Sequence, residues 1–300
     1  MKKKILPLTN LVYSIGYNGY GNIGDDLMFY YSFYNSDFKV ICNSRDYKII
    51  DEIHISNINY YLQIPFTKND VIFFGGNIFV FSSLWSYFKI IYWIILVSSR
   101  SYLKRNTYLK SFGLNIGEYS KFQLFLIEII LKKLDKIECR DLSSYNFILN
   151  KNFANVTFNY DIVLHQNLLK KTTNKRIQNN TVYFFISSQN IKSEIYISHL
   201  FKCLEKRYSV KVLCQGIGDL LFFNRLVQIN PSFSIFSVEI YNYSNLSNIL
   251  NEINNSKFIL TMRYHGGVIG ESLKLDWVPC NSSAKLVNIS STKYMLNEIP

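Results

Sequence analysis

The feature that most constrains this chain of 300 residues is a repeated unit: a short apolar run, a turn rich in glycine or polar residues, and then a helical pattern. The apolar runs are of strand length and lie at residues 11–15, 71–74, 108–112, 137–139, 182–186, 210–214 and 258–260. Strands that alternate with helices favour parallel sheets covered by helices on both faces. We therefore predict an α/β protein.

A polar, basic segment at residues 165–180, HQNLLKKTTNKRIQNN, separates two series of these units. Such a stretch is typical of a linker. With 48% hydrophobic residues, 300 residues suit two domains of ordinary size. We predict two Rossmann-like domains, at residues 1–165 and 178–300, whose strand ends face each other across a cleft.

The second domain contains the stretch KFILTMRYHGGVIGESLKLDWVP at residues 257–279. Its pattern predicts a strand at 258–260, a tight turn at Gly266 and Gly267, and a helix at 268–275. Arg263 and His265 would lie at the carboxyl end of that strand, beside a helix N-terminus, where α/β proteins bind anions. This arrangement predicts a phosphate or carboxylate site. The alternative is that both side chains only cap the turn.

The first strand runs into GYNGYGNIGDD, in which Gly19, Gly21 and Gly24 satisfy the G-x-G-x-x-G pattern of phosphate-binding loops. No acidic residue ends the second strand, so a nicotinamide site is disfavoured. Asp25 and Asp26 fall in the first helical turn, where acids favour the helix dipole. They also suit the binding of sugar hydroxyls.

Charge and cysteine content bound the class of partner and the compartment. The net charge is +12, which favours anionic partners, but it is diffuse and accompanies no nucleic-acid-binding motif, so we expect no nucleic acid partner. No His, Cys or acidic cluster has metal-ligand spacing, so we predict no metal. The five cysteines lie far apart, and MKKKILPLTN lacks the pattern of an export signal. We expect a cytoplasmic protein.

One aromatic, apolar stretch, residues 78–97, is nearly long enough to span a membrane. Lys89 and several serines interrupt it, which disfavours a transmembrane helix. Two explanations stay open. The aromatic side chains belong to a core or to a contact between subunits of a homo-oligomer, or the helix makes a peripheral contact with the inner face of the membrane. The aromatic side chains concerned are Trp85, Phe88, Tyr92 and Trp93.

Six motifs in a fixed order span nearly the whole chain: GYGNIGDD, FFGGN, SFGLNIG, CRDLSS, YDIVL and TMRYHGGVIGESLKL. In this order the chain resembles the polysaccharide pyruvyl transferase family. The resemblance implies a GT-B-like fold with two domains. It also implies transfer of a pyruvyl group from phosphoenolpyruvate onto two hydroxyls of a sugar, which gives a cyclic ketal in a bacterial cell-surface polysaccharide such as a capsule or exopolysaccharide, or in its lipid-linked precursor. Phosphoenolpyruvate is then the donor substrate, and no cofactor is expected.

Carrying over the family's anion-binding residues puts Arg140, Arg263 and His265 at the donor, and Lys285 matches a lysine that follows the last strand. His265 is the predicted general acid, because imidazole titrates near neutral pH, and Asp25 or Asp26 the predicted base. The remaining predicted substrate-binding residues come from the glycine-rich motifs: Gly21, Asn22, Gly24, Gly76, Asn77 and Gly266.

Two alternatives stay open at this point. A GT-B-like glycosyltransferase that uses a nucleotide sugar would share the two-domain build and the basic site. An inactive member of the family would act as a binding subunit.

Overall fold

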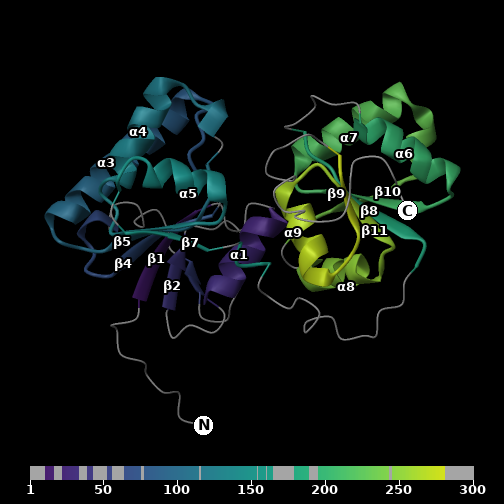
Figure 1. The fold of residues 1–300 in the computed structure, drawn as a ribbon. Coiled ribbons are helices and arrows are strands. Elements are labelled where there is room, and N and C mark those ends of the chain that lie inside the picture. The colour runs from purple at the N-terminus through teal and green to yellow at the C-terminus, as the bar shows by residue number, and fades with distance from the viewer. Residues whose placement is uncertain are drawn as a thin grey trace, which may run out of the picture. The chain divides into compact units, whose positions relative to one another are not determined.

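A computed structural model describes most of the chain (Figure 1). The described residues are 11–16, 22–33, 39–42, 53–55, 64–75, 78–114, 116–153, 155–159, 161–164, 179–188, 195–242 and 245–280.

Contacts divide the chain into two compact units. The first comprises Met1–Tyr20 and Leu27–Ile162, and the second comprises Gly21–Asp26 and Val163–Pro300. The second unit thus includes a short segment from near the N-terminus, which sequence analysis assigned to the first domain. Of the linker predicted at residues 165–180, all but residues 179 and 180 lies outside the described residues.

The first unit is built on a seven-stranded sheet in the order β3-β2-β1-β4-β5-β6-β7, in which every pairing is parallel. Helices α3, α4 and α5 cover one face of this sheet, and α1 lies on the other (Figure 1). The strands are β1 (Leu11–Gly16), β2 (Lys39–Cys42), β3 (Ile53–Ile55), β4 (Asp70–Phe74), β5 (Thr107–Phe112), β6 (Lys136–Cys139) and β7 (Val156–Phe158). The helices are α1 (Ile23–Phe33), α3 (Leu84–Tyr102), α4 (Lys121–Leu131) and α5 (Leu142–Leu149), with short 3-10 turns η2 (Ile64–Phe66) and η3 (Ile116–Glu118).

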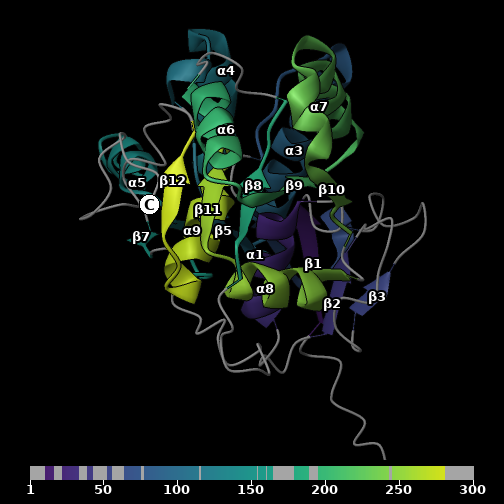
Figure 2. The same cartoon turned by 90° about the vertical axis from the view of Figure 1, so that its right-hand side faces the viewer.

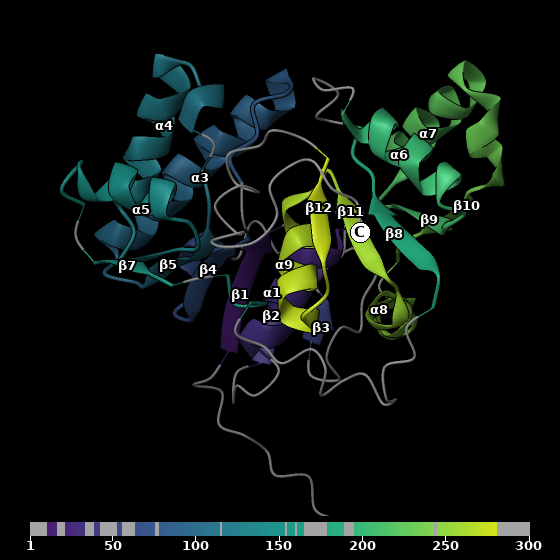
Figure 3. The same ribbon diagram turned by 45° about the vertical axis from the view of Figure 1, so that its right-hand side comes forward.

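The second unit is built on a five-stranded parallel sheet in the order β10-β9-β8-β11-β12, which can be followed across Figure 2. Helices α6 and α7 lie on one face and α8 and α9 on the other (Figures 1 and 3). The strands are β8 (Thr181–Phe185), β9 (Ser209–Cys214), β10 (Ser237–Ile240), β11 (Phe258–Thr261) and β12 (Trp277–Pro279). The helices are α6 (Ile195–Glu205), α7 (Ile217–Ile229), α8 (Leu246–Asn255) and α9 (Tyr264–Leu273), with a 3-10 turn η5 (Pro231–Ile235).

Both sheets have doubly wound order. In each, the chain builds outward from the first strand and then crosses back to continue on that strand's other side. The reversal falls between β1 and β4 in the first unit and between β8 and β11 in the second. Ligands of open α/β sheets bind at the carboxyl ends of the strands beside such a reversal. The predicted α/β class with Rossmann-like sheets is confirmed.

Each unit has its own apolar core, as the alternation of apolar runs predicts. In the first, the ring of Trp93 in α3 packs against Phe73 and Phe79, and Phe79 also packs against Phe112, at centroid distances of 5.1–5.9 Å. In the second, the core strands are apolar on both faces, as is typical of parallel strands with helices on either side. All five cysteines of the chain are among the described residues, and each is a buried free thiol.

Helix α3 is anchored at its C-terminal end by a buried arginine. Arg100 donates to Thr107 Oγ1 at 2.9 Å and to four backbone carbonyls, which belong to residues 64, 67, 69 and 106. Burial lowers the pKa of Arg100 to about 10, so the guanidinium stays charged at neutral pH. These bonds connect α3 to η2, to the segment before β4 and to β5. Within the described residues, no helix has the length and apolar character needed to cross a bilayer.

Candidate functional site

The candidate site lies at the reversal point of the second unit, where β8 and β11 end side by side. Arg263 follows β11 by two residues and is the N-cap of α9. Because α9 begins just after β11, its positive dipole end lies at this edge of the sheet, and no side chain caps it. Arg263 thus lies where an anionic ligand of this fold would bind.

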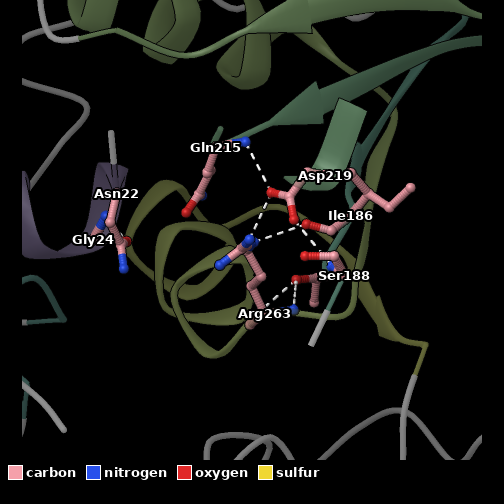
Figure 4. Close-up of polar contacts among 8 residues, drawn as sticks. Asn22, Gly24, Ile186, Ser188, Gln215, Asp219 and Arg263 are labelled. Carbon is pink, nitrogen blue, oxygen red and sulfur yellow. Dashed lines mark hydrogen bonds and ion pairs between the residues drawn. The ribbon is translucent and has the colours of Figure 1, made fainter. Parts of the chain in front are cut away.

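The guanidinium of Arg263 is held on two of its three nitrogens (Figure 4). Nε donates to the carbonyl of Ile186 at 2.7 Å, and Nη2 donates to Asp219 Oδ2 at 2.6 Å. Nη1 has no hydrogen-bond partner among the described residues. The side chain is about one-fifth exposed. One edge of the fork is therefore fixed by the protein, and the other remains available to an oxyanion.

Asp219, in the first turn of α7, organises the loops around this arginine. Its Oδ1 accepts from the backbone N–H of Ser188 at 3.0 Å, and its Oδ2 accepts from the backbone N–H of Gln215 at 2.9 Å. The carboxylate is buried. It therefore connects the ends of β8, β9 and β11 through one side chain. Sequence analysis missed Asp219; the available signal was an acid in the first helical turn after Gly216 and Gly218.

Gln215, at the carboxyl end of β9, has a carboxamide without a partner. The residue is 8% exposed, and neither Oε1 nor Nε2 forms a hydrogen bond with the described residues. In Figure 4 the carboxamide points toward the region bordered by Arg263 and by Asn22 and Gly24. A buried amide without a partner costs free energy, so its presence indicates a ligand group at this position. Sequence analysis assigned Gln215 no role.

His265 lies in the first turn of α9 and is 7% exposed. The imidazole packs against Gly24: a Cβ on residue 24 would lie 1.9 Å from both Cγ and Nδ1 of His265. The ring of Tyr264 also contacts it, edge on, at a centroid distance of 5.2 Å. A glycine at position 24 is thus required for the observed position of the imidazole.

The predicted turn at Gly266 and Gly267 is wrong, because α9 already begins at Tyr264 and both glycines are helical. The hydroxyl of Thr261 makes the turn instead, since it accepts from the N–H of Arg263 at 3.0 Å and donates to the carbonyl of Arg263 at 2.7 Å. Gly266 is needed for close packing, because a Cβ there would lie 2.1 Å from Thr261 Oγ1.

The described part of the glycine-rich loop forms the start of α1. Asn22 Oδ1 accepts from the N–H of Gly24 at 3.1 Å. Asp26 is fully buried and accepts from the hydroxyl of Tyr241 at 2.8 Å. Asp25, by contrast, is only partly buried. The two predicted acids therefore differ in access: Asp25 can reach solvent, and Asp26 binds another part of the second unit.

Arg140 belongs to the first unit and follows β6. Its Nη1 lies 3.4 Å from Asp161 Oδ2 and 3.2 Å from the sulfur of Met28, and the side chain is buried. Gly113 allows this packing, since a Cβ there would lie 3.0 Å from Arg140 Nε. The role of Arg140 at a donor stays a prediction.

Four other predicted residues, Gly21, Gly76, Asn77 and Lys285, lie outside the described residues. Among the residues that the structure describes, no group of three or more His, Cys, Asp or Glu side chains is arranged to hold a metal ion.

Comparisons with known proteins add two findings to this geometry. The fold is similar to that of UDP-GlcNAc 2-epimerase from Methanocaldococcus jannaschii, with a TM-score of 0.57 and 13% identity over 96% of this chain and 93% of that one. It is also similar to the UDP co-structure of MnaA from S. aureus, with a TM-score of 0.58 and 12% identity over 91% of this chain and 80% of that one. At these identities the likeness shows a shared GT-B-like fold and no more.

A search of curated proteins finds no match. The family model for polysaccharide pyruvyl transferase, however, matches residues 10–282, which is most of the chain and includes both units. The chain therefore belongs to the polysaccharide pyruvyl transferase family.

Proposed function

We propose that this protein transfers a pyruvyl group from phosphoenolpyruvate onto two hydroxyls of a sugar, in a cell-surface polysaccharide or its precursor, and so forms a cyclic ketal. The observation that carries the proposal, beside family membership, is the arrangement at the reversal point of the second unit. There Arg263 offers one guanidinium edge next to His265 and the start of α9.

The donor carries a carboxylate and a phosphate, and these groups need cationic and N–H donors. Arg263 Nη1, the carboxamide N–H of Gln215 and the positive end of α9 supply such donors within one unit. The pair between Arg263 and Asp219 fixes the orientation of the guanidinium before a ligand binds, which reduces the entropy lost on binding. The family resemblance also assigns Arg140 to the donor, and that role stays a prediction.

The chemistry needs one proton delivered to carbon and the hydroxyl protons removed from the acceptor. In our proposal His265 protonates the methylene carbon of the donor, a sugar oxygen attacks the neighbouring carbon, and phosphate leaves as the second oxygen closes the ring. Of the two hydroxyl protons, the first passes through Asp25 and solvent to reprotonate His265, and the second leaves with phosphate. Asp25 takes the first hydroxyl proton, because it is more accessible than the buried Asp26.

The test is turnover with phosphoenolpyruvate and a panel of glycosides, followed by phosphate release and by the mass of the ketal product. His265→Asn should lower turnover by roughly 10²–10⁴-fold with donor affinity within a few-fold of the parent. Arg263→Ala should weaken donor binding, at a cost of about 1.5–3 kcal/mol. Arg225→Ala, which removes an exposed arginine from the outer face of α7, is the matched control and should change neither quantity.

Calorimetric titration separates this proposal from the glycosyltransferase alternative. Binding of phosphoenolpyruvate that requires Arg263 supports the proposal. Binding of a UDP sugar or CMP sugar without any binding of phosphoenolpyruvate would instead assign the site to a nucleotide-sugar enzyme, and the proposed pyruvyl transfer would be abandoned.

A further inference from the structure

We propose that the outer surface of α3 and α4 docks the first unit onto an anionic lipid surface. We call this surface the α3–α4 patch. Its apolar members are exposed side chains of the two helices: Leu84, Trp85, Phe88, Ile91, Ile95 and Tyr102 from α3, and Phe122 and Phe125 from α4. The two helices lie side by side in both Figure 1 and Figure 3.

The exposed face of α3 is apolar, whereas a surface helix normally exposes polar and charged side chains. Trp85 is 81% exposed and Phe88 is 54% exposed, and their rings lie 5.8 Å apart. Every exposed residue of α3 is apolar or aromatic except Ser101, and none is charged. The exposed residues recur at positions 84, 88, 91, 95 and 102, which is one stripe of a helix.

The two charged residues of α3 do not lie on this stripe. Arg100 is buried among backbone carbonyls, as described above. The ammonium of Lys89 lies 4.6 Å from the ring centroid of buried Trp93. The helix therefore directs its cations toward the protein and its apolar side chains toward the outside. An exposed apolar stripe of this size indicates a surface that binds another apolar surface.

A helix of the second unit shows the usual pattern for comparison. The exposed face of α7 contains Asn224, Arg225 and Gln228 between its apolar residues. The uninterrupted apolar stripe of α3 is thus a specific property of the first unit rather than of the exposed helices of this chain in general.

Exposed lysines lie at the margins of the patch, and they favour an anionic partner. Residues 84–133 contain eight Lys and Arg against two Glu, and besides Arg100 and Lys89, which are directed toward the protein, most of these cations lie near the ends of α3 and α4. Lys104, Lys121, Lys132 and Lys133, just beyond or at the ends of the two helices, are exposed. Apolar and aromatic side chains that enter a bilayer, with lysines at their margins, are typical of interfacial helices on anionic membranes.

The charge also argues against a second copy of the chain as the occupant. Two patches packed face to face would bring two sets of lysines together, and like charges across an interface are unfavourable. An anionic lipid surface satisfies both the apolar stripe and the cations. Docking there would bring the enzyme to a lipid-linked acceptor, although the inference does not depend on the proposed reaction.

The test is flotation with vesicles of phosphatidylcholine, with and without phosphatidylglycerol, at low and high salt. The wild type should float with the anionic vesicles at low salt and stay in the soluble fraction with neutral vesicles. A Trp85→Ser, Phe88→Ser double variant should lose most of the floating fraction. The matched control is Ile229→Ser, Ile235→Ser, which removes two equally exposed apolar residues from the second unit and should float like the wild type.

A second measurement keeps the test decisive if the double variant does not fold. The three tryptophans are Trp85, Trp93 and Trp277, and only Trp85 is exposed. Brominated lipid in anionic vesicles should therefore quench part of the wild-type fluorescence and should not quench a Trp85→Phe variant, which still floats. Failure of the wild type to float on anionic vesicles at low salt overturns the inference. Light scattering that shows a dimer, converted to monomer by the double variant, would overturn it in favour of a second copy.

Discussion

The contact between Gly24 and His265 makes a sharp prediction about the Gly24→Ala variant. The added Cβ would lie 1.9 Å from two atoms of the imidazole, and ordinary contact begins near 3.4 Å. The imidazole must therefore move by about 1.5 Å or α1 must shift by a similar amount. A misplacement of about 1 Å at a reacting group costs roughly 10²-fold in rate, which corresponds to about 2.7 kcal/mol. We expect turnover to fall by at least that factor, with donor affinity close to the parent.

Steady-state phosphate release with phosphoenolpyruvate and an accepted glycoside measures the loss, and titration with phosphoenolpyruvate measures donor affinity. The matched control is Gly117→Ala, because a Cβ at that glycine meets no atom within 4 Å. In a His265→Asn background, Gly24→Ala should cost little more, since both changes act on the same group.

A structural measurement makes the test independent of the reaction. The chain has four histidines, so the imidazole signals of labelled protein are few enough to assign by NMR. The signal of His265 should shift in Gly24→Ala and stay in place in Gly117→Ala. Normal turnover together with an unshifted His265 signal would refute the reasoning, because the two residues would then not be in contact in solution.

Four further predictions follow from the second unit and the cysteines. Asp219→Ala should lower the free energy of unfolding by about 3–5 kcal/mol, because it leaves two backbone N–H groups and the Arg263 guanidinium without their acceptor. Gln215→Met should weaken binding of phosphoenolpyruvate by roughly tenfold without loss of thermal stability. Burial lowers the pKa of His199 below its ordinary 6.5, so the unfolded chain binds more protons below that pH and stability falls as pH drops; His199→Leu should lose less stability between pH 7.5 and 5.5 in denaturant titrations. Burial raises the pKa of four cysteines, Cys42, Cys139, Cys203 and Cys214, to about 12, and it also raises the pKa of Cys280. A thiol reagent at pH 8 should therefore label the protein only when it is unfolded.

Each of these has a clear contradicting result. A loss below about 1 kcal/mol for Asp219→Ala would mean that water replaces the carboxylate as the acceptor for these donors. Unchanged affinity in Gln215→Met would remove the amide from the ligand site. An identical pH dependence in His199→Leu would show that another group carries the acid sensitivity, and rapid labelling of the folded protein would show that at least one thiol is accessible.

The sequence alone was sufficient for the features that depend on local pattern. Apolar runs marked the core strands of both sheets within one or two residues, because a parallel strand that is covered on both faces must be apolar throughout. The ordered motifs from GYGNIGDD to TMRYHGGVIGESLKL also indicated the family, and the last of them placed Arg263 at a strand end. These signals lie within short stretches of chain, so they can be read without knowing what packs against them.

Only the tertiary structure showed which distant residues meet. Gly24 packs against His265, Asp26 binds Tyr241, and Asp219 holds Arg263, and each pair joins segments far apart in the sequence. The early start of α9 has the same origin, since the hydroxyl of Thr261 bonds the backbone of Arg263 and makes the turn that sequence analysis assigned to Gly266 and Gly267. The sequence also could not decide whether the apolar stripe of α3 is exposed, because the period of apolar residues is the same whether that face of the helix is buried or open to solvent. Burial and long-range pairing depend on the packing of the whole chain, and local pattern does not encode them.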